Sequence, residues 1–218
     1  MIHKANIDSL LRNLPPSVKL VAVSKFKPAE EILEAYKEGI KDFGENRPQE
    51  LKWKMDELPD DINWHFIGHL QTNKIKMIID KVHMIHSVDS MRLFSEINRE
   101  ALKRGITVNC LLQVYIAAED TKQGLSQEEL NEILSVRENY GSVRICGLMG
   151  MASFTENQEV VRAEFRHLKN VFESAKSEYF GSDNNFCNIS MGMSGDYSIA
   201  VEEGSTIVRI GSLIFGER

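Results

Sequence analysis

The sequence has few cysteines and no long apolar run. Its three cysteines, Cys110, Cys146 and Cys187, lie far apart in apolar, strand-like segments. This odd number and wide spacing favour buried free thiols over disulfides or a metal site, and so predict a cytoplasmic protein. The N-terminal residues are polar where a signal peptide needs an apolar core, and no apolar run approaches a membrane span in length.

The chain also has no excess of positive charge. The chain has 26 Lys and Arg against 32 Asp and Glu, and its net charge is -6. This balance argues against nucleic acid or an anionic membrane as the main partner, although a local group of donors could still bind a small anion. No low-complexity tract or Gly/Ser linker divides the chain. Residues 1–218 are therefore predicted to form a single domain, and a monomer is expected.

Short apolar runs alternate with longer amphipathic stretches. The predicted strands span residues 20–25, 42–46, 64–70, 82–88, 108–116, 143–149, 186–191 and 207–214. The predicted helices span residues 30–38, 48–58, 91–104, 127–139, 157–179 and 197–203. Strands that are apolar on both faces and separated by helices indicate a parallel sheet covered on both sides.

The number of strand–helix units indicates which α/β fold the chain adopts. Eight strand–helix units in about 200 residues fit a closed (β/α)8 TIM barrel better than an open doubly wound sheet. The open sheet stays as the alternative, although no Gly-x-Gly-x-x-Gly pattern follows the first strand. Because only a short segment precedes that strand, a trimmed N-terminal helix is expected. The eighth strand is expected to run almost to Arg218.

Polar residues gather where the predicted strands end, which is where barrels carry their functional groups. The main ones are Ser24, Lys25, Glu45, Asn46, His69, Gln71, His86, Asp89, Ser153, Ser194, Arg209 and Ser212. Two interpretations of Lys25 are open from its position alone. In the first, the aliphatic part of the side chain packs against apolar neighbours while the ammonium group reaches water. In the second, apolar surroundings keep the amine neutral and able to attack an aldehyde.

Two loops have the composition of a phosphate site. Residues 191–196 join the seventh strand to a short helix and contain two glycines, and residues 209–212 close the eighth strand. In TIM barrels the loops after strands seven and eight usually bind phosphate, and glycines let backbone N–H groups turn toward an anion. Each loop alone could be an ordinary turn. Their joint occurrence at the expected place favours phosphate binding.

The histidine spacings do not predict a metal site. His65 and His69 have the spacing of a helical zinc site, but on a strand four residues span roughly 13 Å, which prevents joint ligation. His83 and His86 are predicted to lie on opposite faces of their strand.

Five segments spanning nearly the whole chain carry a family resemblance. They are residues 21–28, 43–50, 64–74, 190–196 and 204–212. In this order they resemble the motifs of the pyridoxal 5'-phosphate (PLP) homeostasis proteins. That family is similar to the barrel domain of bacterial alanine racemase, the type III PLP fold, but lacks its second β-domain. The resemblance therefore implies a single PLP-binding barrel.

The resemblance also implies a set of cofactor-binding residues. Lys25 would carry PLP as a Schiff base, and Ser194, Gly211 and Ser212 would hold its phosphate. Arg209 would lie near the pyridine nitrogen. The other implied pocket residues are Asn46, His69 and Met193, with Lys122 and Gly124 in a basic loop over the site.

The function that the resemblance implies is non-catalytic: binding PLP and keeping its supply in balance. The expected partners are PLP and, as recipients, PLP-dependent apoenzymes. Two alternatives stay open. A PLP-dependent racemase, or another fold-type III enzyme, would need a second acid or base opposite Lys25, and no second domain is expected to supply one. A barrel enzyme could instead use Lys25 on a different phosphorylated metabolite, which a visible absorption spectrum would distinguish.

Overall fold

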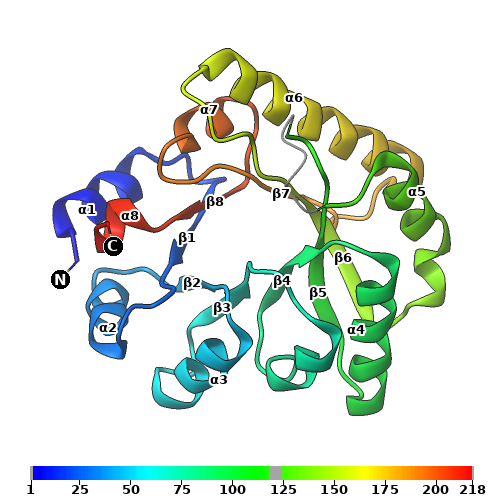
Figure 1. The fold of residues 1–218 in the computed structure, drawn as a ribbon, viewed down its shortest axis with the longest axis horizontal. Helices are drawn as coiled ribbons and strands as arrows, with labels where there is room; N and C mark the ends of the chain where they lie inside the picture. Colours follow the sequence, from blue (N-terminus) through cyan, green and yellow to red (C-terminus); the bar gives the residue numbers. More distant parts are fainter. Residues whose placement is uncertain (1, 118–123, 218) are drawn as a thin grey trace.

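The strands of the protein close into a barrel. The computed structural model describes residues 2–117 and 124–217, and its parallel strands pair in the order β1-β2-β3-β4-β5-β6-β7-β8 (Figure 1). The strands are β1 (Lys19–Val23), β2 (Asp42–Glu45), β3 (Asn63–Phe66), β4 (Met84–Val88), β5 (Val108–Gln113), β6 (Val143–Met149), β7 (Asn188–Ser190) and β8 (Ile207–Ile210). The predicted TIM barrel is confirmed, and the open sheet is wrong, because β1 pairs with both β2 and β8.

Helices surround the barrel on its outside (Figure 1). They are α1 (Lys4–Asn13), α2 (Ala29–Lys37), α3 (Pro48–Glu57), α4 (Met91–Arg104), α5 (Gln127–Val136), α6 (Gln158–Ala175), α7 (Tyr197–Glu202) and α8 (Ser212–Phe215). A 3-10 helix, η1 (Thr72–Met77), connects β3 to β4. Among the described helices, none is long and apolar enough to cross a membrane.

Two apolar clusters make up the core. The larger one packs the outer strand faces against the helices. The smaller one takes residues from five strands that face the barrel interior, and it comprises Val21, Met84, Leu111, Cys146, Met149 and Ile207, with Met151 packed against it. Because side chains alternate along a strand, the other interior positions follow at a spacing of two residues. Those positions include His86 and Arg209, and His65 contacts His86 from β3, so the interior is partly polar.

The two ends of the chain differ from the prediction. An N-terminal helix is present: α1 has ten residues and buries Ile7 and Leu10. The eighth strand ends at Ile210, and α8 follows it. The two terminal helices lie side by side (Figure 1), and the His3 backbone N–H donates to Ile214 O at 2.8 Å. The apolar run after Gly211 forms α8 rather than the end of the strand, and its sequence does not distinguish the two because a short apolar segment fits either a buried strand or a buried helix.

Several other predicted strands are too long at their C-terminal ends. The third strand ends at Phe66 rather than residue 70, and the fifth ends at Gln113 rather than residue 116. The residues beyond them leave the sheet and build the rim of the barrel. Cys110 and Cys146 are buried free thiols as predicted, but Cys187 is exposed, because it lies just before β7 rather than within the strand.

Candidate functional site

A cavity of about 390 Å³ opens at the C-terminal ends of the strands. Six of the predicted cofactor residues line it, namely Lys25, Met193, Ser194, Arg209, Gly211 and Ser212. They come from the turn after β1, the loop after β7, and β8 with the residues that follow it. The volume lies in the range of small-molecule sites, roughly 300–1,000 Å³. The structure thus brings these six residues together, and their contacts to a cofactor stay a prediction.

The turn after β1 presents Lys25 to this cavity. Val21 faces the barrel interior and Val23 lines the cavity, so the period-two pattern of β1 directs Lys25 to the same side. Phe26, the next residue, has a φ of 63°. This left-handed conformation is uncommon for a residue with a side chain, so the turn needs support from its surroundings.

That support is a buried polar network below the turn. Lys54 Nζ donates to Ser24 O at 2.9 Å, to Glu45 Oε1 at 2.7 Å and to Glu50 Oε1 at 2.7 Å. Ser24 Oγ donates to Glu45 Oε1 at 2.5 Å. The Phe26 backbone N–H donates to Glu50 Oε1 at 2.6 Å. The residues on both sides of Lys25 in the sequence are therefore held in place by α3 and β2.

Glu45 has an unusual environment within this network. Burial raises the pKa of Glu45 to about 7, although Lys54 and the Ser24 hydroxyl both favour its charged form. Its Oε2 is buried and has no hydrogen-bond partner among the described residues. Sequence reasoning placed Glu45 on the rim and missed the network. The i,i+4 spacing of Glu50 and Lys54 was the one available signal.

Arg209 is buried beneath the cavity. Its guanidinium donates to Ser190 O at 2.8 Å, Ser190 Oγ at 2.6 Å and Gly150 O at 3.1 Å. Burial lowers the pKa of Arg209 to about 10, and the charge of Asp196 opposes this shift. The side chain is therefore charged at neutral pH and fixed in one orientation.

The loops after β7 and β8 are joined to each other. The Gly211 backbone N–H donates to Ser194 Oγ at 3.3 Å, and the Met193 N–H donates to Asp196 Oδ1 at 2.5 Å. Gly192 has a φ of +96°, and a Cβ there would lie 2.6 Å from the Ala200 Cβ. This position therefore requires glycine, which keeps the loop close to α7.

The remaining predicted site residues do not line this cavity. Asn46 is half-buried at the end of β2, and its buried Oδ1 has no partner among the described residues. His69 is half-exposed and contacts Asp89 Oδ2 through Nδ1 at 3.0 Å. Lys122 lies outside the described residues, and the Gly124 backbone packs against Tyr115. Their roles in cofactor binding stay predictions.

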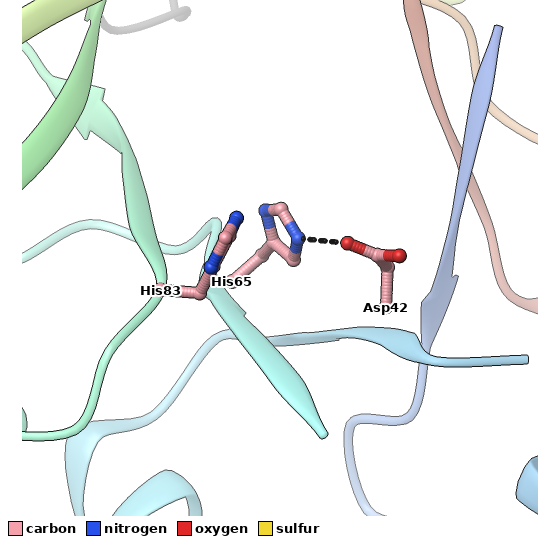
Figure 2. A group of neighbouring side chains, drawn as sticks. All are labelled: Asp42, His65 and His83. Atoms are coloured by element: carbon pink, nitrogen blue, oxygen red, sulfur yellow. Dashed lines mark hydrogen bonds and ion pairs between the residues drawn. The ribbon is translucent and has the colours of Figure 1, made fainter. Parts of the chain in front are cut away.

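The structure contains a histidine cluster that the sequence did not reveal (Figure 2). His65 Nε2 lies 2.9 Å from Asp42 Oδ1, and His65 Nδ1 lies 2.8 Å from His86 Nε2. The His83 ring lies 5.2 Å from that of His65. Burial lowers the pKa of all three histidines, so their neutral forms are favoured. Spacing along a single strand does not reveal these contacts, because they join neighbouring strands.

The carboxylate of this cluster already has partners. Asp42, His65 and His83 each offer a ligand atom, and these atoms lie within 4.8 Å of one another, which is a possible metal-binding arrangement. However, Asp42 Oδ1 also pairs with Lys19 Nζ at 3.2 Å. Burial acts to raise the pKa of Asp42, but the His65 hydrogen bond and Lys19 outweigh it and lower the pKa. Asp42 is therefore an ionised hydrogen-bond acceptor, and it lies where β2 begins, at the N-terminal end of the barrel strands.

Comparison with known proteins places the chain in a family. Residues 3–218 match the family model described as alanine racemase, N-terminal domain. A pyridoxal phosphate homeostasis protein of Aquifex aeolicus is 44% identical over 201 residues, which cover 92% of this chain and 87% of that relative. The chain belongs to the pyridoxal phosphate homeostasis protein family. A second member of this family, from Synechocystis, is 37% identical, and the alignment covers 100% of this chain and 100% of that relative.

Solved structures agree with this assignment. PipY of Synechococcus elongatus without PLP superposes with a TM-score of 0.92 at 36% identity, covering 98% of this chain and 99% of PipY. The same protein with PLP bound has a TM-score of 0.89 at 35% identity, with the same coverage. Alanine racemase from Bartonella henselae has a TM-score of 0.75 at 15% identity over 56% of its chain, which shows a shared barrel fold. The family and the fold predicted from the motifs are both confirmed.

Proposed function

We propose that this member of the pyridoxal phosphate homeostasis family binds PLP at the C-terminal mouth of its barrel and acts in PLP homeostasis without turning over amino acids. The observation that carries the proposal is the convergence of Lys25, two serine-containing loops and Arg209 on one cavity. The PLP-bound structure of the relative PipY supports it. We also propose that the barrel, as one domain, is sufficient for this binding.

The residues around the cavity fit the parts of the cofactor. A lysine amine can form a Schiff base with an aldehyde, so Lys25 would hold PLP covalently. The hydroxyls of Ser194 and Ser212 and the backbone of Gly211 would bind the phosphate, as loops seven and eight do in other TIM barrels. The cavity also contains the charged Arg209, so its donors suit an anionic ligand.

Arg209 would determine the state of the pyridine nitrogen. Bound PLP supplies an electron sink for amino-acid chemistry. A guanidinium near the pyridine nitrogen disfavours protonation of that nitrogen, because two like charges would meet in a poorly solvated place. Arg209 would thereby weaken the electron sink, which agrees with a protein that stores or delivers PLP.

The phosphate assignment predicts a selective loss of affinity. Each hydroxyl contact to a charged oxygen contributes roughly 1.5–3 kcal/mol, so the Ser194→Ala/Ser212→Ala variant should bind PLP far more weakly than wild type. Pyridoxal, which has no phosphate, should bind both proteins about equally. Equilibrium dialysis with the two vitamers measures both affinities. Equal weakening for PLP and pyridoxal would show that these loops do not recognise phosphate.

A PLP-dependent racemase is the second candidate function, because alanine racemase shares the barrel fold. Among the described residues that line the cavity, the titratable ones are Lys25, Asp196 and Arg209. Racemisation needs acid–base groups on both faces of the substrate. Arg209 is a poor proton donor at its pKa of about 10, and Asp196 already accepts the Met193 N–H.

We therefore expect no enzyme-like turnover. PLP-loaded protein should not exchange the α-hydrogen of L-amino acids for deuterium at about 1 per second or faster, which is the low end for enzymes. Proton NMR in deuterium oxide, with Lys25→Ala as the background control, measures this rate. Faster exchange that depends on Lys25 would favour the racemase.

A further inference from the structure

A continuous series of hydrogen bonds crosses the barrel interior. Arg209 Nη1 donates to Ser190 Oγ at 2.6 Å, and Ser190 Oγ lies 3.0 Å from His86 Nδ1. His86 Nε2 lies 2.8 Å from His65 Nδ1, and His65 Nε2 lies 2.9 Å from Asp42 Oδ1. Arg209 lines the cavity at the C-terminal ends of the strands. Asp42 begins β2 and lines a cavity of about 620 Å³ at the opposite end.

The chemistry of the end groups determines the direction of every bond in this series. An ionised Asp42 can only accept, so His65 carries its proton on Nε2. A neutral His65 then accepts at Nδ1 from His86 Nε2–H. His86 Nδ1 is left as an acceptor for the Ser190 hydroxyl, whose oxygen receives the Arg209 N–H. Arg209 can only donate, so its N–H to the Ser190 oxygen is compatible with the directions set from the Asp42 end. We call these five residues the interior chain.

The interior chain has an electrostatic consequence for Arg209. Every donor points away from the guanidinium, so each group presents the negative end of its dipole toward that charge. Hydrogen bonds aligned in this way polarise one another, and their effect is strong where the surroundings have a low dielectric constant. His65, His86, Ser190 and Arg209 are all buried. Lys19 and His83 also contact the Asp42 end, and Lys19 holds the carboxylate in place.

We propose that Asp42, His65, His86 and Ser190 are positioning residues that fix the Arg209 guanidinium toward the PLP cavity, so that a change at Asp42 alters the bound cofactor from the far end of the barrel. This effect on the cofactor rests on the proposed function. The protonation pattern of the interior chain does not, because it follows from the protein's own groups.

The protonation pattern can be measured on the protein without PLP. In nitrogen-15 NMR spectra of histidine-labelled protein, assigned with single His→Gln variants, His65 and His86 should both be protonated on Nε2 and not on Nδ1. A bound metal ion on His65 Nε2 would require the opposite pattern at His65. An Nδ1–H form or an imidazolium at neutral pH, at either residue, would overturn the interior chain.

The effect on the cofactor is tested with matched variants. Ser190→Ala removes the link beside Arg209. Ser205→Ala is its control, because Ser205 is equally buried but donates to backbone carbonyls outside the interior chain. Asp42→Ala removes the last acceptor at a half-buried position. Asp42→Asn keeps an acceptor oxygen and should restore the wild-type behaviour.

We expect Ser190→Ala to bind PLP about tenfold more weakly, the value of one hydrogen bond to a charged group, with a shifted absorption maximum of bound PLP. Asp42→Ala should change the PLP affinity and the absorption maximum in the same direction, but by a smaller amount. If both variants match Ser205→Ala in affinity and spectrum, the proposal is wrong. A wild-type protein that bound no PLP would overturn the proposed function together with this effect, while the histidine spectra would still report whether the interior chain exists.

Discussion

Replacing Lys25 with alanine is expected to abolish covalent attachment of PLP and its visible absorption band, and to leave the melting temperature close to that of wild type. The Schiff base needs the Lys25 amine, so its loss should be complete. The stability of the turn depends on other groups, because Lys54 and Glu50 hold the backbone of Ser24 and Phe26. Substitutions that remove no buried contact usually change stability by less than about 0.5 kcal/mol.

Borohydride reduction followed by peptide mapping measures the attachment directly. The pyridoxyl adduct should appear on the Lys25 peptide of wild type and be missing from Lys25→Ala. Lys27→Ala is the matched control, since Lys27 Nζ points to Phe215 O at 2.7 Å and contacts Glu31 at 3.8 Å. An adduct solely on another lysine would refute the assignment. A wild-type protein with no visible band after incubation with PLP would favour a different phosphorylated metabolite.

Replacing Lys54 with methionine is expected to destabilise the protein by about 3–5 kcal/mol, because it removes one partner of a buried pair. The Glu45 carboxyl then loses its cation and hydrogen-bond donor and must take up a proton to stay buried. The side chains of Lys54 and Glu45 are only 1% and 0% exposed. Urea unfolding at neutral pH measures the change. The double variant Glu45→Gln/Lys54→Met removes both charges and should recover part of the loss. Equal stability of the single and double variants would show that Glu45 is not the cause.

The same pair predicts how stability depends on pH. The pKa of Glu45 rises from 4.5 to about 7 on folding, so the native state binds this proton more tightly than the unfolded state does. The resulting contribution to stability is fully present below pH 4.5 and is lost as pH rises through about 7. Glu45→Gln should therefore remove part of the decline in stability between pH 5 and 8. Glu57→Gln, at an exposed position in α3, should leave the decline unchanged.

Local signals in the sequence were sufficient for most of the fold. Gly105 ends α4 in the left-handed conformation, and Ser126 with Glu129, three residues on, forms a capping box at the start of α5. Such signals act over a few residues, so they can be read along the chain. Where two structures share one local pattern, as in the apolar run that forms α8, the prediction was wrong.

The sequence by itself determined the family, the barrel and six of the residues that meet at the cavity, because the motifs and the order of strands and helices are properties of the linear chain. Only the tertiary structure decided which buried polar groups meet. Ser190 and His86 are 104 residues apart in the sequence, and Lys54 meets Ser24 across 30 residues. A period of two indicates which face of a strand a side chain occupies. It does not indicate which side chain lies opposite, because closure of the barrel determines that.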